Sequence, residues 1–210
     1  SSNINIKRHS HTSSILNDNI FIYGGANETG YIQNGEKLTG ESWGLTDIML
    51  PINTKETSSS VSNNVMYIMS GVNGSGIVNN IMEFNGTSTK VSSINMSIAR
   101  HTHVSDSVSD GIVTRSGMAN NTNIIYNEKI SGDTSYIINS ILVPRSKAQG
   151  TNVTLYEDLE YSHNIISGGV NGDIELYNIE RFVDIPGEIV NVNLNRKDRY
   201  TVSNDKLYKL

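Results

Sequence analysis

The sequence contains no cysteine, and this absence excludes several kinds of chemistry. Disulfide bonds, zinc–thiolate sites and thiol nucleophiles cannot form anywhere in its 210 residues. Proline is also scarce, with three residues, so the chain does not have the composition of a proline-rich disordered tract. No apolar run approaches the roughly 18 residues that a membrane-spanning helix needs. We therefore expect a folded domain that does not insert into a membrane.

Charged residues are few, and the balance between the two signs is slightly acidic. They make up 18% of the chain, and 16 Lys and Arg stand against 21 Asp and Glu, for a net charge of -5. A nucleic-acid surface needs clustered basic residues, so we expect no nucleic-acid partner. Hydrophobic residues reach only 36%, and polar residues and 18 glycines fill the difference. The first residues, Ser1 to Ile4, show no initiator methionine or signal peptide, which suggests a processed or excerpted chain.

Short apolar runs separated by turn residues fill the whole sequence. Runs such as 20–23, 65–69, 136–138 and 188–192 are rich in β-branched and aromatic residues, as strands are. No apolar stripe with helical spacing continues over three turns. Asn and Gly tolerate the positive φ angles of tight hairpins, and together they predict an antiparallel, all-β protein. The turn pairs include Asn63-Asn64, Asn73-Gly74, Asn85-Gly86, Asp110-Gly111 and Asn171-Gly172.

Three landmarks recur in a constant order, with a period of 45 to 51 residues, and indicate internal repeats. The first is a basic residue before a small polar strand, at Arg8, Lys55, Arg100, Arg145 and Arg196. The second is an apolar strand that ends in two small residues, Gly24-Gly25, Ser70-Gly71, Ser116-Gly117 or Gly168-Gly169. The third is an aromatic residue or Gln followed by Asn, at Gln33-Asn34, Phe84-Asn85, Tyr126-Asn127 and Tyr177-Asn178.

This pattern resembles the kelch repeat, and the resemblance covers nearly the whole chain. The first repeat is closest to the family's pattern, with Arg8, His11, the Gly24-Gly25 strand end and Trp43. The resemblance implies four-stranded blades around a central channel, that is, a β-propeller. Each blade is a small twisted sheet that cannot bury both faces alone, so neighbouring blades must pack together.

The repeats predict a single propeller domain over residues 1–210. Four units span 8–54, 55–99, 100–144 and 145–195, and a partial unit spans 196–210. We expect residues 1–7 to complete that partial unit, because an unclosed ring leaves exposed sheet edges. The expected fold is therefore a five-bladed, kelch-like propeller with a composite closing blade. The alternative is that the chain is an excerpt of a six- or seven-bladed ring.

Two histidine pairs are the most obvious candidates for a metal site. His9 and His11 are two residues apart, as are His101 and His103, and on a strand each pair would share one face. The kelch resemblance instead implies structural, hydrogen-bonding histidines. We expect no bound metal and no cofactor.

The arginine anchors admit two interpretations. Arg8, Arg100 and Arg145 could ring one mouth of the propeller and hold an acidic ligand, because guanidinium groups suit carboxylates. Alternatively, each could donate hydrogen bonds to carbonyl groups of the neighbouring blade. Among the acidic residues, Asp106 and Asp110 have no visible partner, and solvated loop charges are the expected interpretation. We expect no catalytic residues.

The loops after the small-residue pairs are the expected binding surface. In a kelch-like blade these loops and the links between blades emerge at the same mouth, and they are rich in adaptable polar residues. The expected ligand-binding residues are Asn27, Glu28, Tyr31, Asn73, Ser75, Asn120, Asn121, Asn171 and Asp173. A non-enzymatic binding module for a protein or a cell-surface glycan is the expected function.

Composition favours one biological setting for such a module. Ile and Asn far outnumber Leu and Ala, as in products of AT-rich bacterial or phage genes. This favours a receptor-binding or structural part of a phage tail or similar particle, in the virion or outside the cell. The alternative function is a sugar-processing enzyme such as a mutarotase, which the kelch resemblance also allows.

Overall fold

The computed structural model describes residues 3–141, 143–154, 162–177, 179–185, 188–194, 200–203 and 206–209. Every regular element within these ranges is a β-strand, which confirms the predicted all-β class. In the described part of the chain, no helix has the length and apolar character needed to cross a membrane.

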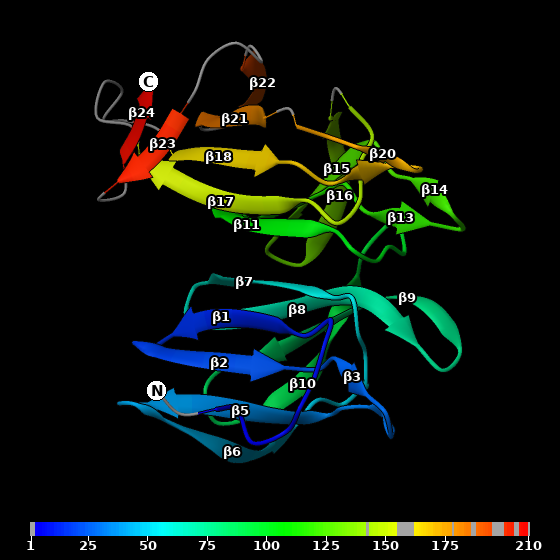
Figure 1. Cartoon of the computed structure of the whole chain (residues 1–210), viewed down its shortest axis with the longest axis vertical. Coiled ribbons are helices and arrows are strands. Elements are labelled where there is room, and N and C mark those ends of the chain that lie inside the picture. Colours follow the sequence, from blue (N-terminus) through cyan, green and yellow to red (C-terminus); the bar gives the residue numbers. More distant parts are fainter. Residues whose placement is uncertain are drawn as a thin grey trace.

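Four four-stranded antiparallel sheets make up most of the described chain (Figure 1). The first contains β1 (Thr12–Leu16), β2 (Asn19–Tyr23), β5 (Asn34–Thr39) and β6 (Ser42–Met49). The second contains β7 (Ser58–Ser62), β8 (Val65–Asn73), β9 (Gly76–Phe84) and β10 (Thr89–Asn95). The third contains β11 (Val104–Val108), β12 (Gly111–Arg115), β15 (Tyr126–Ser131) and β16 (Thr134–Ser140). The fourth contains β17 (Gln149–Thr154), β18 (Ser162–Ser167), β21 (Ile179–Ile185) and β22 (Glu188–Leu194).

These sheets are arranged as the blades of a propeller. The first strands of consecutive sheets, β1, β7, β11 and β17, lie next to one another, and the later strands extend outward (Figure 1). Small hydroxyl residues let these inner strands approach closely. The hydroxyl groups of Thr12 and Ser59 are 2.6 Å apart, and those of Ser60 and Ser107 are 2.8 Å apart. The serine-rich inner strands therefore join adjacent blades through side-chain hydrogen bonds.

A short hairpin follows the second strand of each blade. These hairpins are β3 (Ala26–Asn27) with β4 (Gly30–Tyr31), β13 (Met118–Ala119) with β14 (Thr122–Asn123), and β19 (Val170–Asn171) with β20 (Ile174–Glu175). In the second blade the long strands β8 and β9 continue into the same position. Gly25, just before β3, has φ +88°, and a Cβ there would lie 2.5 Å from the carbonyl oxygen of His9. The second small residue of each pair therefore has to be glycine, as the sequence predicted.

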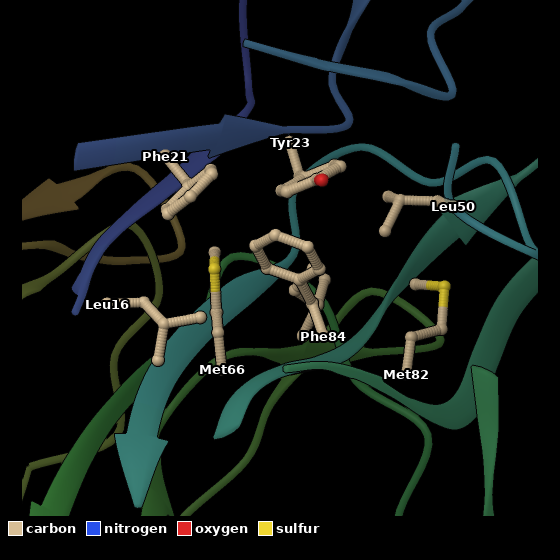
Figure 2. Packing of buried hydrophobic residues seen from close by; sticks show 8 residues of the cluster. Leu16, Phe21, Tyr23, Leu50, Met66, Met82 and Phe84 are labelled. Carbon is tan, nitrogen blue, oxygen red and sulfur yellow. The ribbon is translucent and has the colours of Figure 1, made fainter. Parts of the chain in front are cut away.

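The hydrophobic core lies between blades rather than at the propeller axis. The largest cluster joins the first two blades: Phe84 lies 4.9 Å from Phe21 and 5.0 Å from Tyr23 between ring centroids (Figure 2). Met69 and Ile112 belong to the cluster between the second and third blades. Smaller side chains fill the boundary between the third and fourth blades, namely Val104, Ile141, Ala148 and Ile166.

The expected count of five blades is wrong for the described residues, which form four complete blades. The partial fifth repeat appears only as a hairpin, β23 (Tyr200–Ser203) with β24 (Lys206–Lys209), beside β17 of the fourth blade. The anchor Arg196 lies outside the described residues.

Within the described residues, the N-terminal segment does not pair with this hairpin and lies instead against the first blade. The backbone N–H groups of Asn5 and Ile6 donate to the carboxylate of Glu36 at 2.5 and 3.1 Å, within the first blade. Figure 1 shows the two chain ends at opposite ends of the molecule's long axis. A buried carboxylate is a stronger partner for two amide groups than a distant strand edge, because charged hydrogen bonds are the stronger kind.

Candidate functional site

The predicted binding residues lie at the tips of the four equivalent hairpins. Figure 1 shows these hairpins, β3–β4, β8–β9, β13–β14 and β19–β20, along one side of the molecule. We call this side the hairpin mouth. The links between blades reach it as well, since His9 pairs with Ala26 and His101 pairs with Met118 through isolated bridges. The structure thus gathers the hairpins and the blade links at one side, as the repeats predicted.

The predicted residues differ in how free their side chains are. The Asn27 Oδ1 atom accepts hydrogen bonds from the N–H and hydroxyl groups of Thr29, at 2.9 and 2.7 Å. The Asn73 Oδ1 atom accepts from the N–H of Ser75 at 2.8 Å. These two side chains stabilise their own turns. The exposed members of the set are Glu28, Ser75, Asn120, Asn121, Asn171 and Asp173, of which Asn171 accepts a hydrogen bond from the Asn123 side chain at 3.0 Å.

Tyr31, one of the expected ligand-binding residues, has a partner of its own. The ammonium group of Lys55, from the second blade, lies 5.9 Å from the centre of the Tyr31 ring. This is within the range of a cation–π interaction. Tyr31 therefore bridges the first and second blades at the hairpin mouth.

Four equivalent residues surround the propeller axis at this mouth, and the sequence pattern did not indicate them. Ser10, Glu56, Thr102 and Lys147 all have left-handed backbone conformations, with φ between 52° and 56°. The N–H of Glu56 donates to the Ser10 carbonyl at 2.8 Å, Thr102 to Glu56 at 2.9 Å, and Lys147 to Thr102 at 3.0 Å. We call these residues the axial corners. Their main-chain hydrogen bonds connect all four blades in sequence.

The axial corners surround a cavity of about 220 Å³. Its wall includes His11 and His103, which occupy equivalent places in the first and third blades. His103 is buried, and neither ring nitrogen has a hydrogen-bond partner among the described residues. Burial, with smaller contributions from Arg100 and His101, holds the pKa of His103 well below its ordinary value. Burial and the nearby Arg8 also lower the pKa of His11. Both imidazoles are therefore neutral at physiological pH.

Strand spacing predicted that the two members of each histidine pair would share one face of a strand, and this prediction is wrong. A left-handed residue, Ser10 or Thr102, separates the two members of each pair and changes the direction of the chain. The Nδ1 atom of His9 lies 3.0 Å from the Ser10 hydroxyl, and that of His101 lies 2.6 Å from the Glu56 carboxylate. Within the described ranges, no group of three or more His, Asp or Glu residues is placed to hold a metal ion.

The three anchor arginines are buried inside their blades, so they do not ring the mouth. Arg100 donates to the carbonyl oxygens of Ser116 and Tyr126, and forms a 3.2 Å ion pair with Glu128. Arg8 pairs with Glu36 at 2.9 Å and Arg145 with Glu180 at 2.5 Å in the same way. The carbonyl partners of Arg8 and Arg100 belong to the same blade as the arginine, and Arg145 donates both to Gly168 of its own blade and to Val143 in the link that precedes it. Both interpretations drawn from the sequence therefore need correction.

The glutamates of these pairs also hold the incoming chain. Glu128 accepts hydrogen bonds from the backbone N–H groups of Ser97 and Ile98, as Glu36 does from Asn5 and Ile6. Burial alone would raise the pKa of Glu36, but these hydrogen bonds outweigh it and hold the pKa below its ordinary value. Burial lowers the pKa of Arg100 to about 10, so this guanidinium group stays charged.

In the second blade, two uncharged residues stand where the other blades have the arginine–glutamate ion pair. Lys55, which the sequence indicated as the anchor of this blade, does not occupy the arginine position. Lys55 pairs with Val72 at the position where His9 pairs with Ala26. The residue equivalent to Arg8 is therefore Thr54, which is fully buried. Because Met82 pairs with Ile68 as Glu36 pairs with Ile22, Met82 takes the place of the glutamate. Both charges are absent from this blade together.

Asp106 is a further correction, because it is buried rather than a solvated loop charge. Its carboxylate forms a 2.5 Å ion pair with Arg115, whose side chain is fully buried. Burial raises the pKa of Asp106, although Arg115 opposes the shift. Asp110 is mostly exposed and pairs with Lys129.

Two further cavities open at the hairpin mouth. One, of about 540 Å³, lies beside the first blade and is lined by Lys7, His9, Asn27 and Glu28. The other, of about 400 Å³, lies between the β13–β14 and β19–β20 hairpins. Comparison of the sequence with protein-family models and with curated proteins found no match.

Proposed function

We propose that this protein is a kelch-like propeller that acts as a non-enzymatic binding module, and that its hairpin mouth binds a protein or a cell-surface glycan. One observation supports this most. Four equivalent hairpins carry Asn, Ser, Gly and Asp residues to one mouth, where cavities separate them. Rigid strands that present variable polar tips are a common way to build a binding surface.

The kelch assignment is supported by the internal order of each blade. The buried arginine, the left-handed glycine pair and the outward hairpin recur in the same positions of the first and fourth blades. The third blade keeps the arginine and changes the first glycine to Ser116, which also has a left-handed φ of 58°. A propeller scaffold by itself does not imply a ligand, so the function has to be tested at the mouth.

Binding without catalysis is supported by the location of the charged groups. The strongest acid–base pairs, such as Arg8 with Glu36, lie inside the blades and stabilise them. The alternative function is a sugar mutarotase. Such an enzyme would need an acid and a base that face the same cavity. An assay of sugar anomer interconversion by the purified protein distinguishes the two functions, and turnover would favour the enzyme.

The experiment for the binding function is a glycan array and a screen against surface proteins of candidate hosts, followed by variants of the mouth. Replacing Tyr31, Asn121 and Asp173 with Ala together should weaken binding at least tenfold, since central contacts are each worth on the order of 1 kcal/mol or more. Asp133→Ala is the matched control, because Asp133 is exposed in the β15–β16 turn at the other end of its blade. Equal binding by the triple variant would contradict the proposal.

We further propose that the module belongs to a larger particle, such as a phage tail, and works in a virion or outside the cell. The support is compositional: a low charge content and abundant Asn and Ile. Co-purification of the chain with intact particles tests this. A chain found only free of particles would contradict it.

A further inference from the structure

Two boundaries between blades differ at one equivalent position of the hairpin mouth. In the first blade Tyr31 is the cross-strand partner of Ala26, and in the third blade Asn123 is the partner of Met118. The residue of the next blade that faces this position is Lys55 at the first boundary and Ser146 at the boundary between the third and fourth blades. The two are equivalent because Lys55 pairs with Val72 as Ser146 pairs with Val170. Large side chains thus meet at the first boundary and small ones at the boundary between the third and fourth blades.

The cavity of about 400 Å³ lies where these small side chains meet. Asn123 and Ser146 line it, together with the apolar residues Met118 and Val170. At the first boundary, Tyr31 and Lys55 contact each other across the equivalent space. The cavity is therefore a local property of one boundary and not a general feature of the blades.

Two polar atoms of the cavity wall have no hydrogen-bond partner among the described residues. They are the Oδ1 atom of Asn123 and the Oγ atom of Ser146, whose residue is 1% exposed. The Asn123 amide nitrogen donates to the Val170 carbonyl at 3.2 Å and to Asn171 Oδ1 at 3.0 Å. These two bonds fix the orientation of the amide, so Oδ1 remains a free acceptor. Both residues line the cavity, so their side chains are the candidate partners for the hydroxyl groups of a ligand.

A single cation stands at the edge of the cavity. Lys147 lines it and is exposed, while its backbone is held at an axial corner by the hydrogen bond to Thr102. The ammonium group forms no ion pair with a carboxylate that the structure describes, and the nearby Glu56 carboxylate is engaged by His101. A carboxylate is therefore the natural partner for this free cation.

From this geometry we infer that the cavity between the third and fourth blades binds a saccharide that carries a carboxylate. The apolar face of a sugar ring would contact Met118 and Val170, its hydroxyl groups would bond to Asn123 and Ser146, and its carboxylate would pair with Lys147. This inference rests on the proposed function, in that a glycan binds at the hairpin mouth. It adds the location of the site and the chemical class of the glycan.

The test compares acidic saccharides with neutral ones of similar size by calorimetry. The probes are sialyllactose against lactose and trigalacturonate against maltotriose. We expect at least one acidic probe to bind at least tenfold more tightly than its neutral counterpart. The two acidic probes distinguish a sialic acid from a uronic acid.

Three variants locate the site. Asn123→Tyr copies the residue of the first boundary and fills the cavity, so binding should fall at least tenfold. Ser146→Ala removes a single hydroxyl with little risk to folding and should weaken binding several-fold. Lys147→Gln should remove the preference for acidic probes without affecting neutral ones. Lys55→Gln is the matched control at the filled boundary and should bind like the parent.

The outcomes separate this inference from the proposed function. Acidic saccharides that bind equally well to Asn123→Tyr and Ser146→Ala would overturn the site, while a loss of binding in the Tyr31, Asn121 and Asp173 triple variant would still support the mouth. Equal binding of acidic and neutral probes would overturn the ligand class. No saccharide binding at all would overturn the inference and leave the mouth to be tested with protein partners.

Discussion

At the scale of single residues, the chain contains its own comparison between a buried ion pair and a neutral replacement. Arg100 and Glu128 are charged and buried in the third blade, whereas Thr54 and Met82 occupy the same places in the second. Removing one partner of a buried pair leaves an uncompensated charge, whereas removing both is often nearly neutral. The second blade shows that the fold accepts the double replacement.

Glu128→Gln should therefore destabilise the protein more than the double variant Arg100→Thr with Glu128→Met. We expect a loss of about 3–5 kcal/mol of unfolding free energy for the single variant. Urea unfolding measures it. Glu83→Gln is the control, because Glu83 pairs with Lys90, whose side chain is 71% exposed, and such surface pairs are worth less than about 1 kcal/mol. A double variant less stable than the single variant would contradict this explanation.

His103 should make the stability depend on pH. Its pKa lies well below 6.5 in the folded protein and near 6.5 in the unfolded chain. As the pH falls below 6.5, the unfolded chain takes up a proton that the folded protein cannot, so stability should fall by up to about 1.4 kcal/mol per pH unit. Above that pH both states are neutral and this contribution does not change.

Thermal and urea unfolding between pH 8 and 5 test this dependence. His103→Leu should have a shallower loss of stability in acid than the parent. The exposed residue His9 provides the control, and His9→Gln should keep the parent's slope. Identical slopes for the parent and His103→Leu would show that His103 is not the group responsible.

At the scale of strands and blades, the sequence predicted more of the framework than of the site. Strand ends at Gly24-Gly25 and Gly168-Gly169 were predictable, because positive φ and close approach demand glycine. The third landmark was not a true alignment, because Phe84 lies two residues after Met82 while Tyr126 lies two before Glu128. Only the cross-strand register reveals this difference.

The anchor of the second blade could not be found from the sequence for a related reason. Lys55 is the nearest basic residue, but it lies one position beyond the buried place that Thr54 fills. A basic residue on the surface and a basic residue in the core look the same in a one-dimensional pattern. The cavity lined by Asn123 and Ser146 could not be predicted either. It forms because two residues that are far apart in the sequence face each other and both have small side chains.

The aromatic contact between the first two blades should be the most important single point of packing. Phe84 lies against both Phe21 and Tyr23 and is fully buried (Figure 2). Phe84→Ala should lower the unfolding free energy by about 3–5 kcal/mol, through lost burial and a cavity. Val91→Ala on β10, at a site 41% exposed, should change it by less than about 1 kcal/mol. Chemical denaturation compares the two variants, and similar losses would contradict the assignment.

At the scale of the whole molecule, the repeats predicted the propeller but not its number of blades. The sequence offered a plausible strand at residues 3–6 and a plausible edge in the C-terminal hairpin. What it did not show is that Glu36, buried beside Arg8, provides two hydrogen-bond acceptors for that same segment. The local charged interaction explains why this segment stays with its own blade.

A double-deletion cycle tests this arrangement. Removing residues 1–6 should cost roughly 2–4 kcal/mol, because three hydrogen bonds to the Glu36 carboxylate disappear, two from backbone N–H groups and one from the Asn5 side chain. Removing residues 200–210 should have an independent effect, so the two losses should add. A composite blade would instead make the deletions strongly non-additive, since either one alone would already break the shared sheet. Urea unfolding of the parent, both single deletions and the combined deletion distinguishes these outcomes.

The axial corners have a consequence for how the protein can change over evolutionary time. Three main-chain hydrogen bonds link these four positions, which hold a serine, a glutamate, a threonine and a lysine. Because the fold does not depend on which side chain stands there, substitutions at Ser10, Glu56, Thr102 and Lys147 should alter the chemistry of the mouth while leaving the scaffold intact. The architecture therefore separates a framework held by main-chain hydrogen bonds from a surface whose side chains can change one at a time.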